Sequence, residues 1–413
     1  MACFSQMMSI CIRRFQILLR RWAVPVCYLI FDLDPRRSAG CEKRQALSTM
    51  RIAIDANPMF LTRSGIGNYT YHLICQLIRA DQANEYYLYN TATKDQELGG
   101  LKLGENVQVV CFPRMLSWWR ARQDQIDVYH GTSYQLWTQG KVGSVVTMHD
   151  LALVRFPEFS KRLLGERWPI YKTRKTLERA TRVIAVSHHT ANDIREFYGI
   201  PAEKVRVIYH GVGEEFYSPC DPEARRAVIA KYQIPLENYI LYVGGSDPRK
   251  NLARLLEAFS LLLKKMGPLI LVVTGGMDRG GEVYQKISRL GLEKHVVLTG
   301  HLPPQDLRYL YSAARLFVYP SLYEGFGIPI LEAMASGIPV VTSNTSSLPE
   351  VSGNAALLVD PYDVQAMSRG MQKVLDDPRF ASLLRAKGLE RVKEFSWEKA
   401  ARQTLKVYQE CLT

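Results

Sequence analysis

The sequence lacks the features that define several common classes of protein. Its eight cysteines show no Cys-x-x-Cys pair and no regular spacing, so neither a zinc site nor a disulfide framework is expected. The apolar run Trp22 to Phe31 is too short to span a bilayer. The chain carries no basic stripe interleaved with aromatic residues and no recognisable DNA-reading helix, which argues against nucleic acid as a partner. The spacing of the cysteines therefore predicts free thiols, as expected in a reducing compartment.

The composition indicates a large, basic protein with more than one core. A chain of 413 residues with 47% hydrophobic content is too long for a single core, so two domains are expected. The net charge of +13 suits phosphate-bearing substrates, other polyanions or an anionic membrane surface.

The first 49 residues differ from the rest of the chain. They hold four of the cysteines and eight Lys or Arg against three acids. Met50 is followed at once by the apolar strand Arg51 to Asp55, so we interpret residues 1–49 as a mispredicted start or a disordered leader. The alternative is a basic interfacial helix over Ile10 to Phe31, although Pro25 weakens it. The faint lipoprotein box Ser38 to Cys41 is attributed to chance.

From Met50 onward, β-branched runs alternate with amphipathic helical stretches, which is typical of parallel sheets covered by helices. Two such series are predicted, separated by the Gly- and Pro-rich segment Gly211 to Pro222. The predicted domains are residues 50–215 and 216–395, and a helix over residues 396–413 could pack back on the first domain. The predicted strands of the first series are Ile52–Ile54, Val107–Val110, Val128–Tyr129, Val145–Met148, Val183–Val186 and Val205–Ile208. Those of the second are Tyr239–Val243, Leu269–Thr274, Val296–Leu298, Leu316–Tyr319, Val340–Val341 and Ala356–Val359.

The most informative segment runs from Tyr319 to Glu332. It reads as a strand, a glycine loop and a helix start, and it carries the carboxylates of Glu324 and Glu332. A helix start beside Gly325 and Gly327 offers bare N–H groups and close backbone approach, which favours a phosphate or diphosphate. The two carboxylates would then accept hydrogen bonds from sugar or ribose hydroxyls.

A second anion signal follows the strand Tyr239 to Val243. Glycines lead there to Arg249 and Lys250, which can offer charge-assisted bonds to a diphosphate and to the negative charge that grows on it as it departs. Thr299-Gly-His301-Leu302 ends another strand of this domain and could offer backbone groups to a nucleotide base.

The first domain contributes further strand ends. Gly65-Ile-Gly67-Asn68-Tyr69 opens a helix near a ligand, but it lacks the third glycine of a dinucleotide fingerprint, which disfavours a dehydrogenase. His149 and Asp150 end another strand, so both should project into the cleft between the domains. Ser187 follows the next strand and is expected to cap the helix after it.

Taken together, these segments resemble the retaining glycosyltransferases of family 4. The resemblance rests on Glu324-x7-Glu332, the Val-Gly…Arg-Lys-Asn turn, the Gly-Ile-Gly-Asn-Tyr loop and the His-Asp strand end, and it covers about Met50 to Tyr408. It implies the GT-B fold, an α/β architecture of two doubly wound Rossmann-like domains facing an interdomain cleft. The first domain would bind the acceptor and the second the nucleotide sugar.

The resemblance also implies a role for each matching residue. Glu324 would contact hydroxyls of the donor sugar, Glu332 would hold the ribose, and His149 would lie near the transferring sugar. Some members carry an arginine where this chain has Gly245, so the diphosphate would depend on Arg249 instead. The implied catalytic residues are His149, Glu324, Arg249 and Lys250. The implied donor-binding residues are Gly65, Gly67, Gly245, Arg249, Lys250, His301, Leu302, Glu324, Gly325, Phe326, Gly327 and Glu332, and the acceptor-binding ones are Asn68, Tyr69 and Asp150.

The implied reaction moves a hexose from a nucleotide sugar to a glycan or lipid-linked oligosaccharide. Same-face attack, with a departing phosphate oxygen taking the acceptor proton, needs no protein nucleophile. No metal and no cofactor are expected, because Arg249 and Lys250 supply positive charge and the only Asp-x-Asp, Asp32-Leu-Asp34, lies in the leader. The sequence variants favour mannose from GDP-mannose, with a UDP-hexose as the other donor type. Such acceptors lie at the inner face of the membrane, so a cytoplasmic protein in peripheral contact with anionic lipid is expected.

Other functions remain open at this point. A GT-B-like sugar epimerase would need further acids around the donor sugar, and a phosphorylase would need a pyridoxal lysine. A catalytically silent scaffold at the membrane surface is the third alternative, and the presence of Glu324, Glu332 and Lys250 argues against it.

Overall fold

A computed structural model describes residues 49–61, 65–91, 104–137, 142–157, 167–217, 220–234, 239–277 and 280–413. Within it, Thr49–Thr413 forms one compact unit. The predictions made for the leader, including its interfacial helix and Asp32-Leu-Asp34, lie outside the described residues. None of the helices in the described ranges combines the length and apolarity that a membrane crossing needs.

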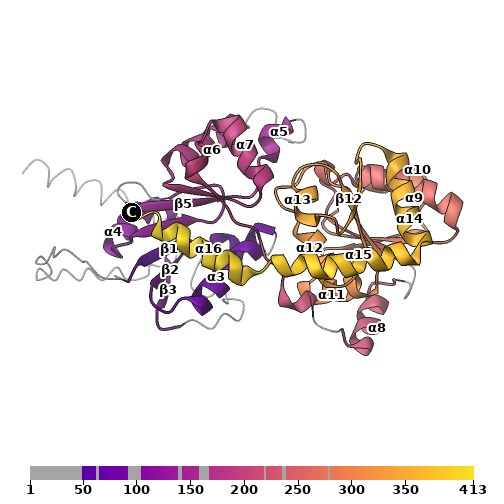
Figure 1. The fold of residues 1–413 in the computed structure, drawn as a ribbon, viewed down its shortest axis with the longest axis horizontal. Helices are drawn as coiled ribbons and strands as arrows, with labels where there is room; N and C mark the ends of the chain where they lie inside the picture. The colour runs from indigo at the N-terminus through magenta and orange to yellow at the C-terminus, as the bar shows by residue number, and fades with distance from the viewer. Residues whose placement is uncertain are drawn as a thin grey trace, which may run out of the picture. The chain divides into compact units, whose positions relative to one another are not determined.

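The first lobe is built on a parallel sheet with the order β3-β2-β1-β4-β5-β6-β7 (Figure 1). Its strands are β1 (Arg51–Asp55), β2 (Glu85–Asn90), β3 (Val107–Cys111), β4 (Val128–Gly131), β5 (Gly143–Met148), β6 (Arg182–Ala185) and β7 (Val205–Val207). The strand order reverses between β1 and β4, which is where doubly wound folds hold their ligands.

The second lobe repeats this plan with the order β10-β9-β8-β11-β12-β13, again all parallel. Its strands are β8 (Tyr239–Val243), β9 (Ile270–Thr274), β10 (Val296–Gly300), β11 (Leu316–Tyr319), β12 (Val340–Ser343) and β13 (Leu357–Val359). Here the order reverses between β8 and β11. All strands predicted from the sequence are present, and both sheets are doubly wound.

One strand of the first sheet, β2, was not predicted. Its sequence Glu-Tyr-Tyr-Leu-Tyr-Asn lacks the β-branched residues that marked the others, although aromatic residues also favour strands. Tyr86 and Tyr89 are fully buried, and their hydroxyls donate to Asp81 at 2.6 Å and to Asp124 at 2.9 Å. The buried hydroxyls are therefore satisfied, which lets a tyrosine-rich strand lie inside the sheet.

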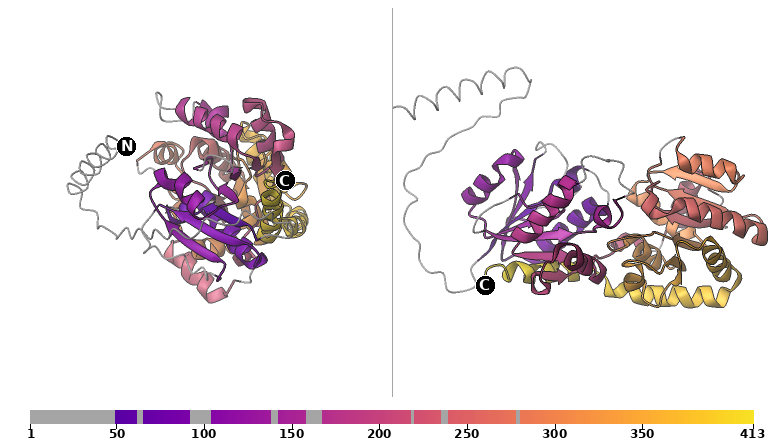
Figure 2. Two further views of the ribbon diagram at one scale, coloured as in Figure 1. Left: turned by 90° about the vertical axis from the view of Figure 1, so that its left-hand side faces the viewer. Right: turned by 90° about the horizontal axis from the view of Figure 1, so that it is seen from above.

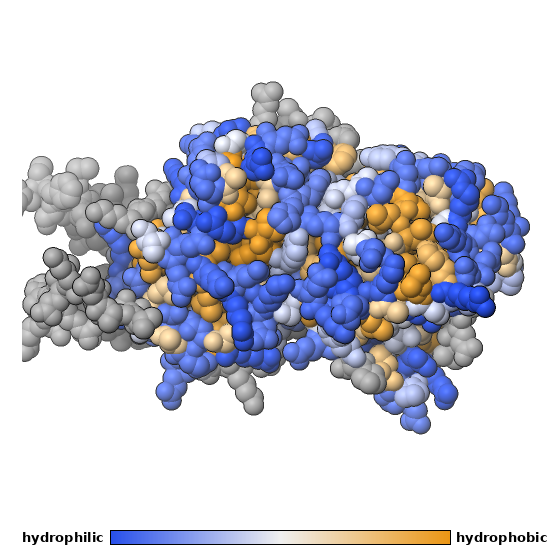
Figure 3. Space-filling view, viewed as in Figure 1, coloured by the Kyte–Doolittle hydropathy of each residue, from blue (hydrophilic) through white to orange (hydrophobic). Residues whose placement is uncertain are grey.

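Helices cover both sheets, and the strands are buried as parallel sheets require (Figure 2). The helices of the first lobe are α2 (Asn57–Leu61), α3 (Gly65–Ala80), α4 (Ser117–Gln123), α5 (Ala152–Arg155), α6 (Arg167–Arg179) and α7 (His188–Tyr198), with the 3-10 turns η1 (Arg114–Leu116) and η3 (Ala202–Lys204). The next 3-10 turn, η4 (Glu214–Phe216), packs on the second lobe. The helices that follow are α8 (Pro222–Lys231), α9 (Leu252–Met266), α10 (Glu282–Arg289), α11 (Pro304–Ala313), α12 (Ile328–Ala335), α13 (Leu348–Ser352), α14 (Val364–Asp376), α15 (Pro378–Arg391) and α16 (Trp397–Gln409), with η5 (Pro248–Lys250) and η6 (Val392–Glu394). On the face seen in Figure 3, apolar residues reach the surface in separate patches among hydrophilic ones.

The last helix, α16, packs against α3 of the first lobe, as Figure 1 shows. Trp397, Ala401 and Tyr408 are buried in the hydrophobic core of the first sheet. The Tyr408 hydroxyl lies 2.7 Å from Nδ1 of the buried His130. The end of the chain therefore completes the core of the lobe in which the described chain begins.

Candidate active site

A cavity of about 620 Å³ lies at the carboxyl ends of strands from both sheets. Its volume suits a small-molecule ligand, and its position matches the crevice that doubly wound sheets use for binding. The predicted site residues that line it are Gly65, Asn68, His149, Asp150, Arg249, Lys250, His301, Leu302, Glu324, Gly325, Phe326, Gly327 and Glu332. Residues predicted from well-separated chain segments are thus brought together.

The carboxylate of Glu324 lies at the centre of a buried polar cluster. Its Oε1 accepts hydrogen bonds from the Tyr319 hydroxyl at 2.8 Å, the Ser321 hydroxyl at 2.9 Å and Lys250 Nζ at 3.2 Å. Its Oε2 accepts from Arg249 Nη1 at 2.9 Å. Because β8 and β11 are neighbours in the sheet, the basic turn after one strand meets the acidic loop after the other.

The charges of this cluster hold one another in the ionised state. Burial alone would raise the pKa of Glu324, but the charges of Lys250 and Arg249 outweigh it and lower the pKa to about 2. Burial alone would lower the pKa of Arg249 and of Lys250. The negative charge of Glu324 outweighs this effect and raises the pKa of both. The cluster therefore stays a carboxylate with two cations at every physiological pH.

Local geometry fixes the basic turn after β8. The Asp247 carboxylate accepts from the Arg249 amide at 2.9 Å and so starts η5. Asn251 adopts a left-handed conformation with φ of 62°, and its side-chain amide donates to the carbonyls of Pro320 and Pro361 at 3.0 and 2.7 Å. These bonds tie the turn to the strand that leads into the Glu324 loop.

The Glu324 loop is in close contact with the first lobe. A Cβ on Gly325 would lie 1.6 Å from the carbonyl oxygen of His149, so only glycine fits. The Gly325 carbonyl accepts from the hydroxyls of Ser187 at 2.7 Å and Thr190 at 3.2 Å, at the start of α7. The predicted helix cap is also present, since the Ser187 side chain accepts from the Thr190 amide.

The same helix makes two more contacts with the second lobe. The Tyr323 hydroxyl donates to Asp193 at 2.6 Å. The Glu350 carboxylate accepts from the amides of His188 and His189 at 2.7 and 3.1 Å, where the positive end of the helix dipole favours a carboxylate. Helix α7 thus binds both the Glu324 loop and α13 of the second lobe.

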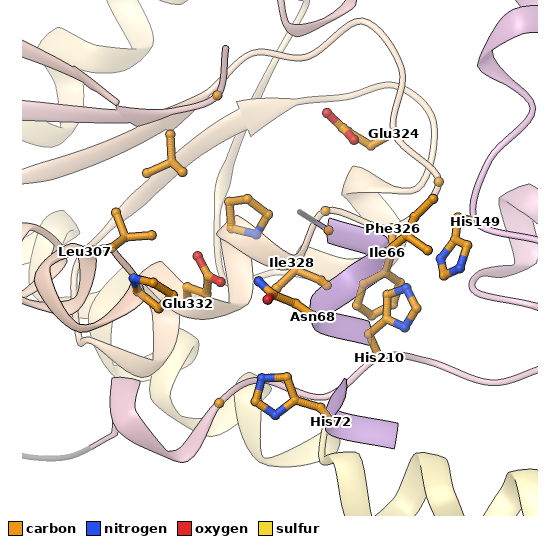
Figure 4. Close-up of a pocket in the computed structure, with 18 of the residues that line it drawn as sticks. Ile66, Asn68, His72, His149, His210, Leu307, Glu324, Phe326, Ile328 and Glu332 are labelled. Atoms are coloured by element: carbon orange, nitrogen blue, oxygen red, sulfur yellow. The ribbon is translucent and has the colours of Figure 1, made fainter. Parts of the chain in front are cut away.

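Glu332 lies on α12 in a different environment. Burial raises its pKa to about 7, even though the Tyr311 hydroxyl donates to it at 2.9 Å; the charge of Glu215 adds to the rise. No described cation forms a salt bridge with it. Figure 4 shows Glu332 well apart from Glu324 in the same cavity. The two carboxylates therefore carry different chemistry.

His149 is buried, and its Nε2 lies 2.8 Å from the carbonyl oxygen of Thr132. Because a carbonyl only accepts, Nε2 carries the proton. Burial lowers the pKa of His149, which leaves Nδ1 with a lone pair in the neutral ring. The ring packs edge-on against Tyr69 at 4.7 Å and lies 5.7 Å from the His210 ring; Figure 4 shows the two histidines together.

Three of the predicted site residues do not line the cavity. Gly67 is buried within α3, and a Cβ added to Gly245 would meet the Gly276 carbonyl oxygen at 2.8 Å. Tyr69 is also buried, and its hydroxyl lies 2.9 Å from that of Thr147. Tyr69 therefore packs against the rings of His149 and His210 and does not line the cavity in which an acceptor would bind.

Several lining residues were not predicted from the sequence. His210 follows β7 much as His149 follows β5, so the strand-end rule would have found it. Tyr319, which bonds to Glu324, is the last residue of a predicted strand. Trp397 comes from α16 and could not be placed without the tertiary fold. The further lining residues that were not predicted include His72, Tyr134 and Glu215.

The electrostatic arrangement can bind a polyanion at one end and polar groups elsewhere. Two partly buried cations, Arg249 and Lys250, line the cavity together with Gly325 and Gly327, while Asp150 and Glu332 offer acceptors to hydroxyls. In the part of the chain that the structure describes, no group of three or more His, Cys, Asp or Glu side chains is placed so as to hold a metal ion.

Comparison with known proteins identifies the family. Residues 63–216 match the model of Glycosyltransferase Family 4, and residues 225–391 match that of glycosyl transferases group 1. The O-antigen chain mannosyltransferase B of Escherichia coli is 32% identical over 384 residues, which cover 87% of this chain and 99% of that protein. The chain therefore belongs to the group 1 glycosyltransferases, and it is a hexosyltransferase.

Solved structures agree on the fold. A sucrose-phosphate synthase from Thermosynechococcus elongatus matches with a TM-score of 0.71 at 23% identity, covering 87% of this chain and 98% of that one. The Anabaena protein HepE, in complex with UDP, matches with a TM-score of 0.68 at 18% identity, covering 88% of this chain and all of that one. These matches confirm the predicted GT-B fold.

Proposed function

We propose that the chain is a retaining, metal-independent hexosyltransferase that transfers mannose from GDP-mannose to a glycan or lipid-linked acceptor of surface polysaccharide. The mannose donor is supported by the similarity to an O-antigen mannosyltransferase over nearly the whole of that protein. A protein that works on lipid-linked acceptors would act at the inner face of the membrane.

The observation that carries the proposal is the buried cluster of Arg249, Lys250 and Glu324 at the switch point of the second sheet. Glycosyl transfer breaks the bond between the sugar C1 and a phosphate oxygen, and negative charge grows on the leaving diphosphate. Two cations fixed before the reaction stabilise that charge without rearranging. They perform the task that a divalent cation performs in other enzymes.

The state of Glu324 supports retention without a protein nucleophile. Its carboxylate accepts four hydrogen bonds and has a pKa of about 2, so it is a weak nucleophile with little free capacity. The acceptor oxygen would attack C1 from the face that the phosphate leaves, and its proton would pass to the departing phosphate oxygen. Glu324 mainly positions Arg249 and Lys250, and its contact with sugar hydroxyls stays a prediction.

The remaining roles follow from the cavity lining. Glu332, away from the cations, would bind the ribose as an acceptor of hydroxyl hydrogen bonds. The backbone N–H groups at the start of α12, after Gly327, would bind the diphosphate. Neutral His149 would lie beside the transferring sugar, with Asp150 and Asn68 toward the acceptor.

The test is a transfer assay with purified full-length protein, GDP-mannose, UDP-glucose and ADP-glucose as donors, and EDTA added throughout. We expect transfer from GDP-mannose alone, with the anomeric configuration kept in the product. Lys250→Gln should lower kcat by at least about a hundredfold, since one fixed cation at a leaving group contributes on the order of 3 kcal/mol. The exposed Lys265→Gln, at the far end of α9, is the matched control.

The outcomes separate the alternatives. Epimerised nucleotide sugar as the only product would indicate an epimerase, and release of sugar 1-phosphate would indicate a phosphorylase. A folded protein that binds no donor in thermal-shift screening would indicate a silent scaffold. Inactivation by EDTA, or full activity in Lys250→Gln, would contradict the proposed catalytic role of the cations.

A further inference from the structure

The short helices between β3 and β4 expose a dense group of large apolar side chains. Met115, Leu116, Trp118 and Trp119 are 78%, 42%, 48% and 42% exposed, all within η1 and α4. We call these four residues the tryptophan face. Other large exposed apolar residues in the described ranges, such as Leu153, stand singly along the sequence, as is normal for a protein surface.

The residues on the opposite side of this segment are buried or hydrogen-bonded to the first lobe, so the tryptophan face points to solvent. Ser117 and Ala121 are buried, and the Ser117 hydroxyl donates to the Trp137 carbonyl at 2.6 Å. Asp124, just after α4, holds Arg120 at 2.8 Å and the Tyr89 hydroxyl at 2.9 Å. The small and polar residues thus fix the segment to the sheet, and the tryptophans are left to solvent.

The charge around the tryptophan face is positive. Arg114 and Arg122 are exposed, and neither forms an ion pair with a described carboxylate; Arg120 is already neutralised by Asp124. The Arg122 guanidinium lies 6.0 Å from the Trp118 ring centre, and that of Arg114 lies 4.5 Å from the ring of Trp137. Exposed tryptophans beside arginines that form no ion pair with a described carboxylate are the composition that settles at the headgroup level of an anionic bilayer.

We propose that the tryptophan face, with Arg114 and Arg122, docks the enzyme on anionic phospholipid. The indole rings would enter the interfacial region while the arginines contact lipid phosphates. Just after α4 (labelled in Figure 1), the Asp124 carbonyl accepts a hydrogen bond from the side chain of Arg51, the first residue of β1, so α4 ends at the amino edge of the first sheet, opposite the edge that carries the cavity. The inference goes beyond the proposed function, because it assigns a membrane contact to a surface away from the cavity, and lipid binding is measurable without sugar transfer.

The test is co-sedimentation of the full-length protein with sucrose-loaded vesicles of phosphatidylcholine and phosphatidylglycerol in a ratio of about 3:1, against phosphatidylcholine alone. We expect the anionic vesicles to bind more protein, and higher salt to weaken the binding. The double variant Trp118→Ser/Trp119→Ser should lower the partition constant roughly tenfold or more, because two large apolar side chains lose their burial. Leu383→Ser/Leu389→Ser, two comparably exposed apolar residues of α15, is the matched control and should bind as wild type.

The charge contribution is tested with two variants that change the net charge equally. Arg114→Gln/Arg122→Gln should reduce binding to anionic vesicles, whereas Arg379→Gln/Arg385→Gln, exposed on α15, should change it little. Transfer to a water-soluble acceptor is measured in parallel and should be unchanged in the tryptophan variant. Equal vesicle binding by wild type and the tryptophan variant would overturn the proposal. A second outcome would also overturn it: the wild type forms a dimer, does not bind vesicles, and dissociates when the tryptophans are substituted. The tryptophan face would then contact a second copy of the chain.

Discussion

Glu324 and Glu332 belong to one short motif, yet the structure gives them opposite effects on stability. The informative perturbation is the same substitution at both positions, Glu324→Gln and Glu332→Gln. Glutamine keeps the shape of the side chain and removes only its ability to ionise. The free energy of unfolding, measured against pH, should then separate the two residues.

For Glu324 the folded-state pKa lies below the ordinary value. A fall from 4.5 to about 2 corresponds to about 3 kcal/mol of stability, at about 1.36 kcal/mol per unit. This contribution is present above pH 4.5, where the unfolded chain is also ionised, and is lost as the pH falls toward 2. We therefore expect Glu324→Gln to be less stable than wild type by about 3 kcal/mol at neutral pH, because Arg249 and Lys250 stay largely shielded from water without their counter-charge.

For Glu332 the sign reverses. Burial raises its pKa from 4.5 to about 7, so the folded state favours the protonated acid. The stabilisation of wild type is complete below pH 4.5 and is lost as the pH rises through 7. Without bound donor, Glu332→Gln should be as stable as wild type at about pH 4.5 and more stable than wild type at about pH 8. The difference at about pH 8 should be no more than about 3 kcal/mol, because the Glu332 side chain is only partly shielded from water.

Urea denaturation followed by far-UV circular dichroism measures both effects, with midpoints compared between about pH 4.5 and pH 8. The described part of the second lobe contains no tryptophan, so a fluorescence signal would report mainly on the first lobe. A shift of both variants in the same direction at the higher pH would refute the electrostatic assignment. So would a Glu324→Gln variant as stable as wild type.

Two further substitutions test the contacts around the site. Gly325→Ala should cost about 1–3 kcal/mol and disturb the contact with α7, because its Cβ would meet the His149 carbonyl, whereas Gly276→Ala has open space and should not; thermal melts with and without GDP measure this. Tyr408→Phe should destabilise the protein by about 1–3 kcal/mol, because Nδ1 of the buried His130 loses its partner, whereas the exposed Tyr362→Phe serves as the neutral control in urea denaturation. Wild-type stability in Gly325→Ala or in Tyr408→Phe would contradict the corresponding contact.

Local patterns were sufficient to predict most of the architecture. Short apolar runs with β-branched residues marked every strand except β2. The tyrosines of β2 also favour a strand, because aromatic residues are enriched in strands. The rule that ligands gather at the carboxyl ends of parallel strands predicted that His149, Lys250 and Glu324 share one cavity, as they do. That rule depends only on the direction of the strands, which the alternation with helices already indicates.

The interactions within the site could not be predicted in the same way. The pairing of Glu324 with Arg249 and Lys250 depends on β8 lying next to β11, and strand order is a property of the whole lobe. The family resemblance implied that Glu324 contacts sugar hydroxyls, which stays a prediction, and it did not indicate that the same carboxylate pairs with both cations. The burial of Tyr69 likewise depends on α16, which arrives from the far end of the chain.

The position of α16 also sets the order in which the two lobes can be completed during synthesis. The hydrophobic core of the first lobe includes Trp397, Ala401 and Tyr408, which are synthesised after the whole second lobe. The whole second lobe is synthesised in between, which takes on the order of 10 s or more at cellular rates of translation. The first lobe is therefore completed only after the second lobe has been made, and a nascent chain must keep the apolar surface of α3 and β5 shielded until α16 emerges to cover it.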